Sequence, residues 1–425
     1  MAAHTVEFHP VGQGLFSTGT VSSYGNGETF HYVYDCGTSS SKKFLSNAIS
    51  SYKKSVKTLD LVVISHFDKD HISGLIELLE HHPTRILMLP AISLSQKLVI
   101  AFSEGISIGS RYMHFILDPV AYLTSHPKIK VHNIIFVPAD HDEKTEIIES
   151  SANDLSETRT NWPEMLLADL NKASTIARDN LTIHTLKQGG RLILNQVFEF
   201  VPYNDALLST VSRSFKTQVE KEKEILLNQS STTTDKKSAL SKLKSYYDKR
   251  FGSDSIARNM ISLFLYTGPI NETVLCSDLE FYRYRLNDAG LASCLKSKYI
   301  KTQQPSVLFT GDGYLNTHKR LNNLAQYIGT TRLNDIGCLQ VMHHGSKHSW
   351  HDGLAKKLSP VLSVFSSDPS NRRLQHPHLE VIRDFLPYIP TQVDKDHRVI
   401  FRSETVFLPN LIDSDGAPTD RTIFY

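Results

Sequence analysis

The feature that most constrains the fold is a short, largely apolar run that ends in a cluster of polar side chains. Leu59 to Ser65 is apolar apart from Asp60 and Ser65, and it has the length of a strand buried on both faces, as in a sheet covered by helices. The loop that follows carries His66, Asp68, Asp70 and His71. Four such donors cannot all point away from one another, so the loop predicts a site for divalent cations. Capping of the next helix by Asp70 is the alternative reading, but a cap needs no histidine.

Strand and helix signals alternate on both sides of this run. Short apolar segments between glycine turns predict strands, and apolar residues at helical spacing predict helices. Strands are expected at Thr5–His9, Leu15–Val21, Phe30–Tyr34, Leu59–Ser65, Arg85–Leu89, Leu181–Leu186, Arg191–Leu194, Val197–Pro202, Met260–Tyr266, Ser306–Thr310, Leu339–Met342, Val361–Phe365 and Val399–Arg402. Helices are expected at Phe44–Tyr52, Ile72–Leu79, near Leu94–Phe102 and, weakly, around Pro163–Leu170. This alternation predicts an α/β sandwich.

Polar clusters follow three of the later strands, where an open α/β sheet builds its ligand site. Asp312 stands between two glycines; its carboxylate could bridge two cations or simply make a sharp turn. His343 and His344 precede Gly345-Ser346, and Ser366-Ser367-Asp368 follows the next strand. Further along, His376-Pro377 is either a catalytic or a structural turn, and the nearby pair Arg372 and Arg373 could hold a phosphate.

Three segments are expected to be insertions in a single domain that spans residues 1–425. The first, 139–180, has ten acidic and four basic residues, a net charge of −6. The second, 204–257, includes a predicted helical hairpin at 213–250 with ten basic and five acidic residues, a net charge of +5. The third is 277–304. The basic hairpin is either a solvated helix face or a contact for nucleic acid.

Composition limits the possible partners and location of the chain. A net charge of +2 excludes nucleic-acid binding by overall charge, so such binding needs a local patch. The sequence has no apolar run long enough for a membrane helix, and its N-terminus lacks a secretory signal. Its four cysteines form no CxxC pair, which argues against a zinc ribbon and against structural disulfides. These features predict a soluble, cytoplasmic protein.

The order of these motifs resembles that of the metallo-β-lactamase fold superfamily. The motifs are Asp35-Cys36-Gly37, His66-x-Asp68-x-Asp70-His71, Thr310-Gly311-Asp312, His343-His344-Gly345-Ser346 and His376-Pro377. Within the superfamily, the segments V-G-Q-G, H-T-L-K-Q-G-G-R-L-I-L and N-M-I-S-L-F-L look most like the soluble hydrolase domain of the competence protein ComEC and its free-standing bacterial relatives. The resemblance runs from about Val6 to about Ile382 and implies a four-layer αββα sandwich.

The resemblance also implies a site for two divalent ions, Zn²⁺ or Mn²⁺. It assigns His66 and Asp68 to the first ion, and Asp70, His71 and His344 to the second. Asp312 would lie between the ions, and Asp35 would steady the loop. His343 stays open as an alternative to His344. Ser346, Arg372 and Arg373 would contact substrate.

Two positions depart from the usual pattern of the superfamily. Asp68 stands where most members have histidine, and an added carboxylate makes Mn²⁺ as plausible as Zn²⁺. The histidine that many members place between the first loop and the bridging aspartate has no clear counterpart. The histidines in that interval, none within a convincing motif, are His114, His126, His132, His141 and His184.

The implied reaction is phosphodiester hydrolysis by a hydroxide that bridges the two ions. Asp70 would orient or deprotonate the nucleophile, and His376 or His343 would protonate the leaving oxygen. The resemblance implies a nuclease, with DNA the favoured substrate, and a role in antiphage defence is a family-level hypothesis. A small-molecule hydrolase, acting on a cyclic nucleotide or a lactone-like ester, and a binding protein with a residual metal site are the alternatives. β-Lactam hydrolysis is disfavoured by the lack of a secretory signal, while a protein partner or activator and the oligomeric state stay open.

Overall fold

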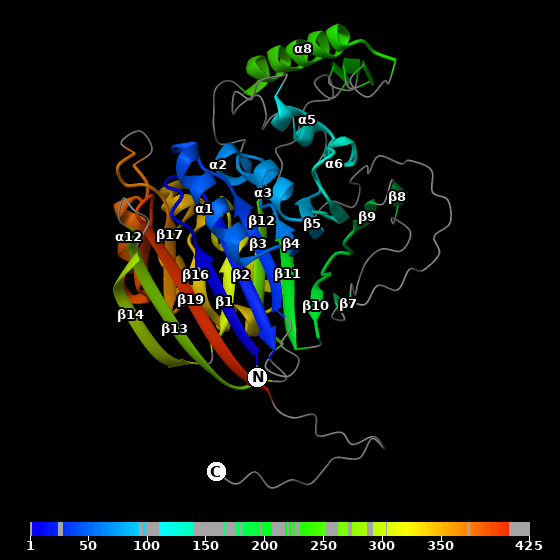
Figure 1. Ribbon diagram of the computed structural model, residues 1–425. Coiled ribbons are helices and arrows are strands. Elements are labelled where there is room, and N and C mark those ends of the chain that lie inside the picture. Colours follow the sequence, from blue (N-terminus) through cyan, green and yellow to red (C-terminus); the bar gives the residue numbers. More distant parts are fainter. Residues whose placement is uncertain are drawn as a thin grey trace.

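Two large β-sheets face each other and carry helices on their outer sides, as the computed structural model shows (Figure 1). The structure describes residues 2–23, 29–92, 97, 110–139, 165–166, 176–178, 181–195, 197–205, 217–218, 221–222, 224–225, 230–251, 262–270, 274–286, 292–302, 304–371 and 375–407. All structural statements below concern these residues.

The first sheet has eleven strands in the described part of the chain, in the order β14-β13-β19-β1-β2-β3-β4-β5-β6-β9-β8. Their bounds are β1 (Ala2–Phe8), β2 (Phe16–Ser23), β3 (Thr29–Cys36), β4 (Leu59–Val63), β5 (Thr84–Pro90), β6 (Val131–Val137), β8 (Ile176–Arg178), β9 (Leu181–Thr185), β13 (Val274–Leu286), β14 (Ala292–Thr302) and β19 (His397–Phe407). Strands β3 to β6 and β9 run parallel, so their carboxyl ends meet at one edge.

The second sheet has eight strands among the described residues, in the order β18-β17-β16-β15-β12-β11-β10-β7. Their bounds are β7 (Met165–Leu166), β10 (Leu192–Leu194), β11 (Phe198–Asn204), β12 (Leu263–Pro269), β15 (Ser306–Phe309), β16 (Ile336–Gln340), β17 (Leu362–Ser366) and β18 (Pro390–Val393). Strands β15 to β18 are parallel, so the segments that follow β15, β16 and β17 leave the sheet at the same edge.

Helices cover the outer face of each sheet. On the first sheet lie α1 (Lys42–Ser55), α2 (Lys69–Ile72), α3 (Leu75–His81), α5 (Arg111–Leu117) and α6 (Pro119–Ser125). On the second lie α9 (His318–Ile328), α10 (Thr330–Asn334), α11 (Leu354–Leu358) and α12 (Leu379–Phe385). None of the described helices is long and apolar enough to cross a membrane.

Three separate hydrophobic cores define the layers. One lies between the first sheet and its helices and includes Phe16, Leu45 and Phe115. A second fills the space between the sheets, where the ring of Phe309 stacks on Tyr34 with centroids 4.6 Å apart. A third lies between the second sheet and helices α9 to α12. Three cores between four layers give the αββα order that the resemblance implies.

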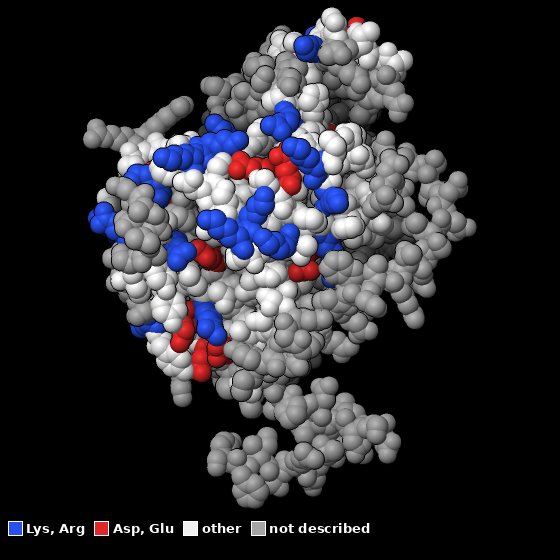
Figure 2. All heavy atoms as spheres, viewed as in Figure 1, with Lys and Arg blue, Asp and Glu red and all other residues white. Residues whose placement is uncertain are grey.

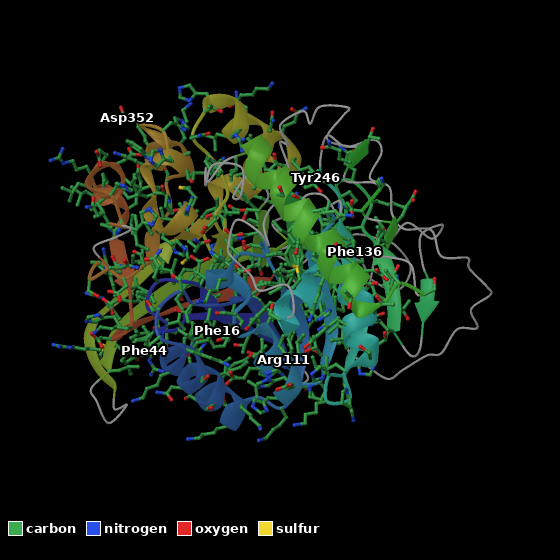
Figure 3. The ribbon with its side chains drawn as sticks, turned by 90° about the horizontal axis from the view of Figure 1, so that it is seen from above. Phe16, Phe44, Arg111, Phe136, Tyr246 and Asp352 are labelled. Atoms are coloured by element: carbon green, nitrogen blue, oxygen red, sulfur yellow. The ribbon has the colours of Figure 1, made fainter. Side chains whose placement is uncertain are left out.

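Helix α8 (Thr233–Phe251) lies at one end of the molecule, beyond α5 (Figure 1). Its residues Leu240 and Leu243 are buried in the first core, and Tyr246 packs against the same core (Figure 3). Glu222, buried at 2% exposure, pairs with Lys242 of this helix at 3.5 Å. The second half of the predicted basic hairpin is therefore a docked helix.

Most of the expected elements are present, with three differences. The prediction of a helix around Pro163–Leu170 is wrong at Met165–Leu166. These two residues form strand β7 and pair with β10, because extended backbone at this position completes the edge of the second sheet. The helix expected near Leu94–Phe102 lies outside the described residues except at Lys97. The segment 277–304 forms much of the β13–β14 hairpin, which extends the first sheet alongside β19.

Candidate metal centre

The polar residues singled out in the sequence meet at one edge of the two sheets. After β4, His66 and Asp68 lie in a loop and Asp70 and His71 in the first turn of α2, and Asp35 is the second-last residue of β3. From the second sheet come Asp312 after β15 and the turn Met342–Gly345 after β16. Parallel strands place these segments together because their carboxyl ends share an edge.

A buried hydrogen-bond network fixes the orientation of His66 and His71. Asp35 is fully buried; it accepts hydrogen bonds from the Ser65 amide (2.7 Å), the Ser65 hydroxyl (2.6 Å) and His71 Nδ1 (2.7 Å). The Ser65 Oγ in turn accepts from His66 Nδ1 at 2.8 Å. Since both Nδ1 atoms donate outward, both Nε2 atoms face the centre, where each would offer a lone pair to a bound cation.

The carboxylate of Asp312 lies in the middle of the cluster. His71 Nε2 is 3.0 Å and His344 Nε2 is 3.5 Å from its Oδ1, whereas His66 Nε2 is 3.7 Å from its Oδ2. Asp70 Oδ2 is 3.2 Å from His344 Nε2. Asp70, His71, Asp312 and His344 thus form a compact group whose ligand atoms all lie within 4.8 Å of one another.

The turn that holds Asp312 is fixed by Gln340 from the neighbouring strand. Gln340 Oε1 accepts from the amides of Thr310 (2.9 Å) and Gly311 (2.7 Å). Gly311 has φ +53°, and a Cβ there would lie 2.7 Å from Ser65. Glycine is required because a side chain would push the bridging aspartate away from the His66 loop.

The two histidines of the next turn both have left-handed backbone, with φ 47° at His343 and φ 56° at His344. Such backbone costs about 1–3 kcal/mol for a residue other than glycine and clusters at functional sites. His344 Nδ1 donates to the Ser366 carbonyl at 2.5 Å, and its Nε2 faces Asp70 and Asp312. Of the two histidines, His344 therefore belongs to the compact group, as the resemblance implies.

An unsatisfied buried atom shows that the residues fit a cation. His66 Nε2 is buried without a hydrogen-bond partner in the described part of the chain, and its nearest carboxylate oxygens lie 3.7 Å and 3.9 Å away. Buried polar atoms are nearly always satisfied, and His and Asp in this arrangement are ligands for Zn²⁺ or Mn²⁺. The cluster is thus a possible metal-binding site.

The charges of the cluster depend on one another. Burial, together with the nearby charge of His71, lowers the pKa of His66 to about 3. Burial opposes protonation of His71 too, but the carboxylates of Asp312 and Asp35 outweigh it and raise the pKa of His71 well above its usual value. Burial would raise the pKa of Asp70, yet its hydrogen bond to His344 and the charge of His71 lower that pKa to about 2. The raised pKa values of His71 and His344 favour the protonated forms of both rings when no metal is bound.

His376 and Ser346 lie at the border of the cluster. The His376 ring centroid is 5.6 Å from that of His343 and 6.2 Å from that of His344, and its Nδ1 is buried without a partner among the described residues. Ser346 is buried, and its Oγ accepts from the His348 amide at 3.4 Å, so it supports the turn locally. Arg372 and Arg373 lie outside the described residues.

The histidines considered for the missing middle ligand lie in other surroundings. His184 Nε2 bonds to the Asn133 side chain at 3.1 Å, and His126 pairs with Glu80 at 3.4 Å. His114 and His132 are exposed, and His141 lies outside the described residues.

Three residues of the centre, Ser65, Gln340 and Ser349, have no signal in the sequence analysis. They position the predicted residues through hydrogen bonds, as does Ser366, which belongs to the polar cluster already identified after the strand at Val361–Phe365. Ser65 could have been suspected, because it precedes His66 directly. Gln340 and Ser349 are separated in sequence from their partners or carry no distinctive spacing.

Residues 19–145 match a family model described as the Metallo-beta-lactamase superfamily. This region includes the His66 loop but ends before Asp312 and His344. No curated protein matches the sequence. Among solved structures, the Rm3 metallo-beta-lactamase is 12% identical, with a TM-score of 0.25 over 80% of this chain and 80% of that chain. The metallo-beta-lactamase MIM-1 from Novosphingobium pentaromativorans is 9% identical, with a TM-score of 0.25 over 90% of this chain and 86% of that chain. The layers described above and the family match together confirm the predicted α/β, αββα fold class.

Proposed function

We propose that this chain is a metal-dependent phosphodiester hydrolase whose substrate is nucleic acid, DNA in particular. The observation that carries the proposal is the position of Asp312, with His71 and His344 at one carboxylate oxygen and His66 at the other. A carboxylate with histidines at both oxygens suits two cations. Such a pair, when bound, lowers the pKa of water and stabilises the charge that develops on a phosphoryl group.

The chain's own side chains supply the proton transfers. Asp70 has the most exposed carboxylate of the compact group, at 18%, and its low pKa keeps it ionised, so it can accept a hydrogen bond from the attacking water. Burial lowers the pKa of His376 to about 3, so its ring is neutral before substrate binds. An anionic phosphate beside the ring would favour its protonated form, which could then protonate the leaving oxygen.

The surface offers charge for a polyanion despite the small net charge of the chain. Lys and Arg side chains gather on the face that carries α1 and α3 (Figure 2). Helix α1 exposes Lys42, Lys43, Lys53 and Lys54, and of these Lys42 lies 3.6 Å from Glu77. Exposed lysines can contact the phosphates of a nucleic acid, and such contacts position the nucleic acid without reading its sequence.

A small-molecule hydrolase is the second candidate. The cluster is deeply buried, with Asp312 at 3% exposure and His66 at 0%, which favours a small ester over a long strand. Cyclic nucleotides and lactone-like esters are the substrates to include.

The test compares wild-type protein with Asp312→Asn, and uses Asp60→Asn as the matched control. Asp60 is a partly buried carboxylate that accepts from the His31 amide at 2.8 Å and lies on β4 outside the cluster. Metal-depleted protein is resupplied with Mn²⁺, Zn²⁺ or Mg²⁺ and assayed on linear and circular DNA, RNA, a cyclic nucleotide and bis-p-nitrophenyl phosphate. We expect metal-dependent DNA cleavage in wild type and Asp60→Asn, with at least about a 100-fold loss in Asp312→Asn. Turnover of the small esters alone would support the second candidate instead.

The narrower part of the proposal is a ComEC-like nuclease that acts in antiphage defence, and it rests on sequence resemblance. Phage plating on cells that carry wild-type or Asp312→Asn protein tests it. Equal plating efficiencies would count against a defensive role and leave the hydrolase proposal standing.

A further inference from the structure

The adjacent residues His343 and His344 lie at opposite oxygens of the Asp312 carboxylate. His344 Nε2 is 3.5 Å from Oδ1, and His343 Nε2 is 3.5 Å from Oδ2. Their consecutive left-handed conformations separate two side chains that would otherwise be neighbours. The Oδ2 side therefore holds two histidines, His343 and His66, just as the Oδ1 side holds His344 and His71.

The two ring nitrogens have the same orientation in all four histidines. Each Nε2 faces Asp312, and each Nδ1 lies within hydrogen-bond distance of an oxygen on the outside of the cluster. These oxygens are Ser65 Oγ for His66 (2.8 Å), Asp35 Oδ2 for His71 (2.7 Å), the Ser366 carbonyl for His344 (2.5 Å) and Ser349 Oγ for His343 (3.0 Å). Histidines that bind metals almost always show this orientation, with the outer nitrogen bonded to an oxygen that fixes the tautomer.

Ser349 is itself held in place. It is fully buried, it hydrogen-bonds to Tyr314, and its carbonyl accepts from the Leu315 amide at 2.9 Å. The Ser349 hydroxyl can accept from His343 Nδ1 and donate to the Tyr314 oxygen at the same time. In that arrangement the lone pair of His343 lies on Nε2, the nitrogen 3.5 Å from Oδ2 of Asp312.

The distances on the Oδ2 side suit a shared cation better than direct hydrogen bonds. His66 Nε2 is 3.9 Å from Asp68 Oδ2 and 3.7 Å from Asp312 Oδ2, and the corresponding distance from His343 is 3.5 Å. These separations exceed those of N–H···O hydrogen bonds. Two donors at about 2.1 Å from one ion in tetrahedral geometry lie about 3.4 Å apart.

We propose that His343 is a ligand of the first cation, together with His66, Asp68 and Oδ2 of Asp312. It takes the place of the middle histidine, for which the sequence shows no clear counterpart, and it comes from the same turn as the histidine of the second ion. The inference rests on the proposed metal-dependent function. It removes His343 from the two candidates for the leaving-group acid and leaves His376.

Metal counting tests the assignment without an activity assay. Wild type, His343→Ala, His344→Ala and the double variant are stripped of metal, titrated with Mn²⁺ by calorimetry, and analysed for bound metal by mass spectrometry. We expect two ions in wild type, one in each single variant and none in the double variant. His348→Ala, which removes an exposed histidine four residues from His344, is the matched control and should keep both ions.

Two further variants make the test independent of folding effects. His343→Gly removes the imidazole at a position where glycine accepts the positive φ, and should lose the same ion as His343→Ala. Ser349→Ala keeps the imidazole but removes its outer oxygen, and should weaken binding of the first ion about 10–100-fold. Ser363→Ala is the control, because Ser363 is equally buried and its Oγ has no partner among the described residues.

Binding of two ions with wild-type affinity by both His343→Ala and His343→Gly would overturn the assignment. The assignment would also fail if wild type bound a single ion and the His343 variants still bound that ion. It would fail as well if the double variant bound as many ions, with the same affinity, as His344→Ala does. DNA cleavage by the metal-loaded wild type is measured separately, so the hydrolase proposal can stand when this inference fails.

Discussion

Replacing Asp35 by asparagine should weaken metal binding while leaving the fold in place. The carboxylate accepts three buried hydrogen bonds, one of them from His71 Nδ1 at 2.7 Å. Asparagine fills the same volume and tolerates the φ of 57° at this position. Its amide oxygen can still accept from the Ser65 amide, but its NH₂ group then faces Ser65 Oγ and His71 Nδ1. His71 must turn its Nδ1 into an acceptor, which puts the proton on Nε2, the atom that would bind the second ion.

The size of the effect follows from the bond that is lost. A hydrogen bond to a charged group contributes about 1.5–3 kcal/mol, and each 1.4 kcal/mol is about a factor of ten in affinity. Loss of the bond between His71 and Asp35 should therefore weaken the second ion about 10–150-fold. Substitutions of residues that orient metal-bound histidines typically cost about 10–100-fold, which is the same range.

Calorimetric titration of the metal-depleted protein with Mn²⁺ measures this loss, and Asp60→Asn serves as the control carboxylate. We expect the affinity of one ion to fall, and the metal-free protein to stay folded with a lower urea midpoint, because it loses the same buried hydrogen bond. Wild-type affinity for both ions in Asp35→Asn would refute the reasoning, because it would mean that the tautomer of His71 does not depend on Asp35.

Three further predictions concern protons, backbone and core. The pKa of His71 is raised, so the metal-free ring is protonated at neutral pH. The attraction between this protonated ring and the carboxylates of Asp312 and Asp35 stabilises the folded metal-free protein fully below about pH 6.5, and this stabilisation is lost as the pH rises through the raised pKa. Metal binding should therefore release about one proton or more, measured by calorimetry in buffers of different ionisation enthalpy, and affinity should fall as the pH is lowered. Gly37→Ala should reduce metal binding, since the new Cβ would lie 2.4 Å from the His71 amide nitrogen, whereas Gly189→Ala, with nothing within 4 Å, should bind metal normally. Phe309→Ala should cost about 3–5 kcal/mol in urea unfolding because its ring fills the core between the sheets, against less than about 0.5 kcal/mol for the exposed Leu379→Ala; equal midpoints for this pair would contradict the placement of Phe309.

Local sequence was sufficient to predict the strands around the metal loop and the side chains on that loop that could bind a metal. Leu59–Val63 forms a parallel strand that is buried except at Asp60, as its largely apolar sequence predicts, and the segment after it brings His66 close to His71 at the start of α2, with ring centroids 4.0 Å apart. These features depend on residues a few positions apart, so the sequence carries their signal directly. The polar clusters at the ends of β15 and β16 were identified for the same reason.

Sheet assignment was not available from local sequence. The strands around Gly189 and Gly190 read as neighbours across a turn, yet β9 belongs to the first sheet and β10 to the second. The hairpin of β13 and β14 was missed, although it pairs with β19 more than 110 positions away along the chain. Pairing over such distances depends on which edges are open in the folded molecule, and this has no local pattern.

The difference between what the sequence determined and what the tertiary structure determined is clearest at Asp312. The sequence by itself determined that an aspartate between two glycines follows a strand, and that two histidines follow the next one. Only the tertiary structure decided that Gln340 holds that turn, that Ser349 orients His343, and that the two histidines face different oxygens of one carboxylate. These contacts depend on distances between separate strands and on backbone conformation at single residues, which are set when the two sheets pack together.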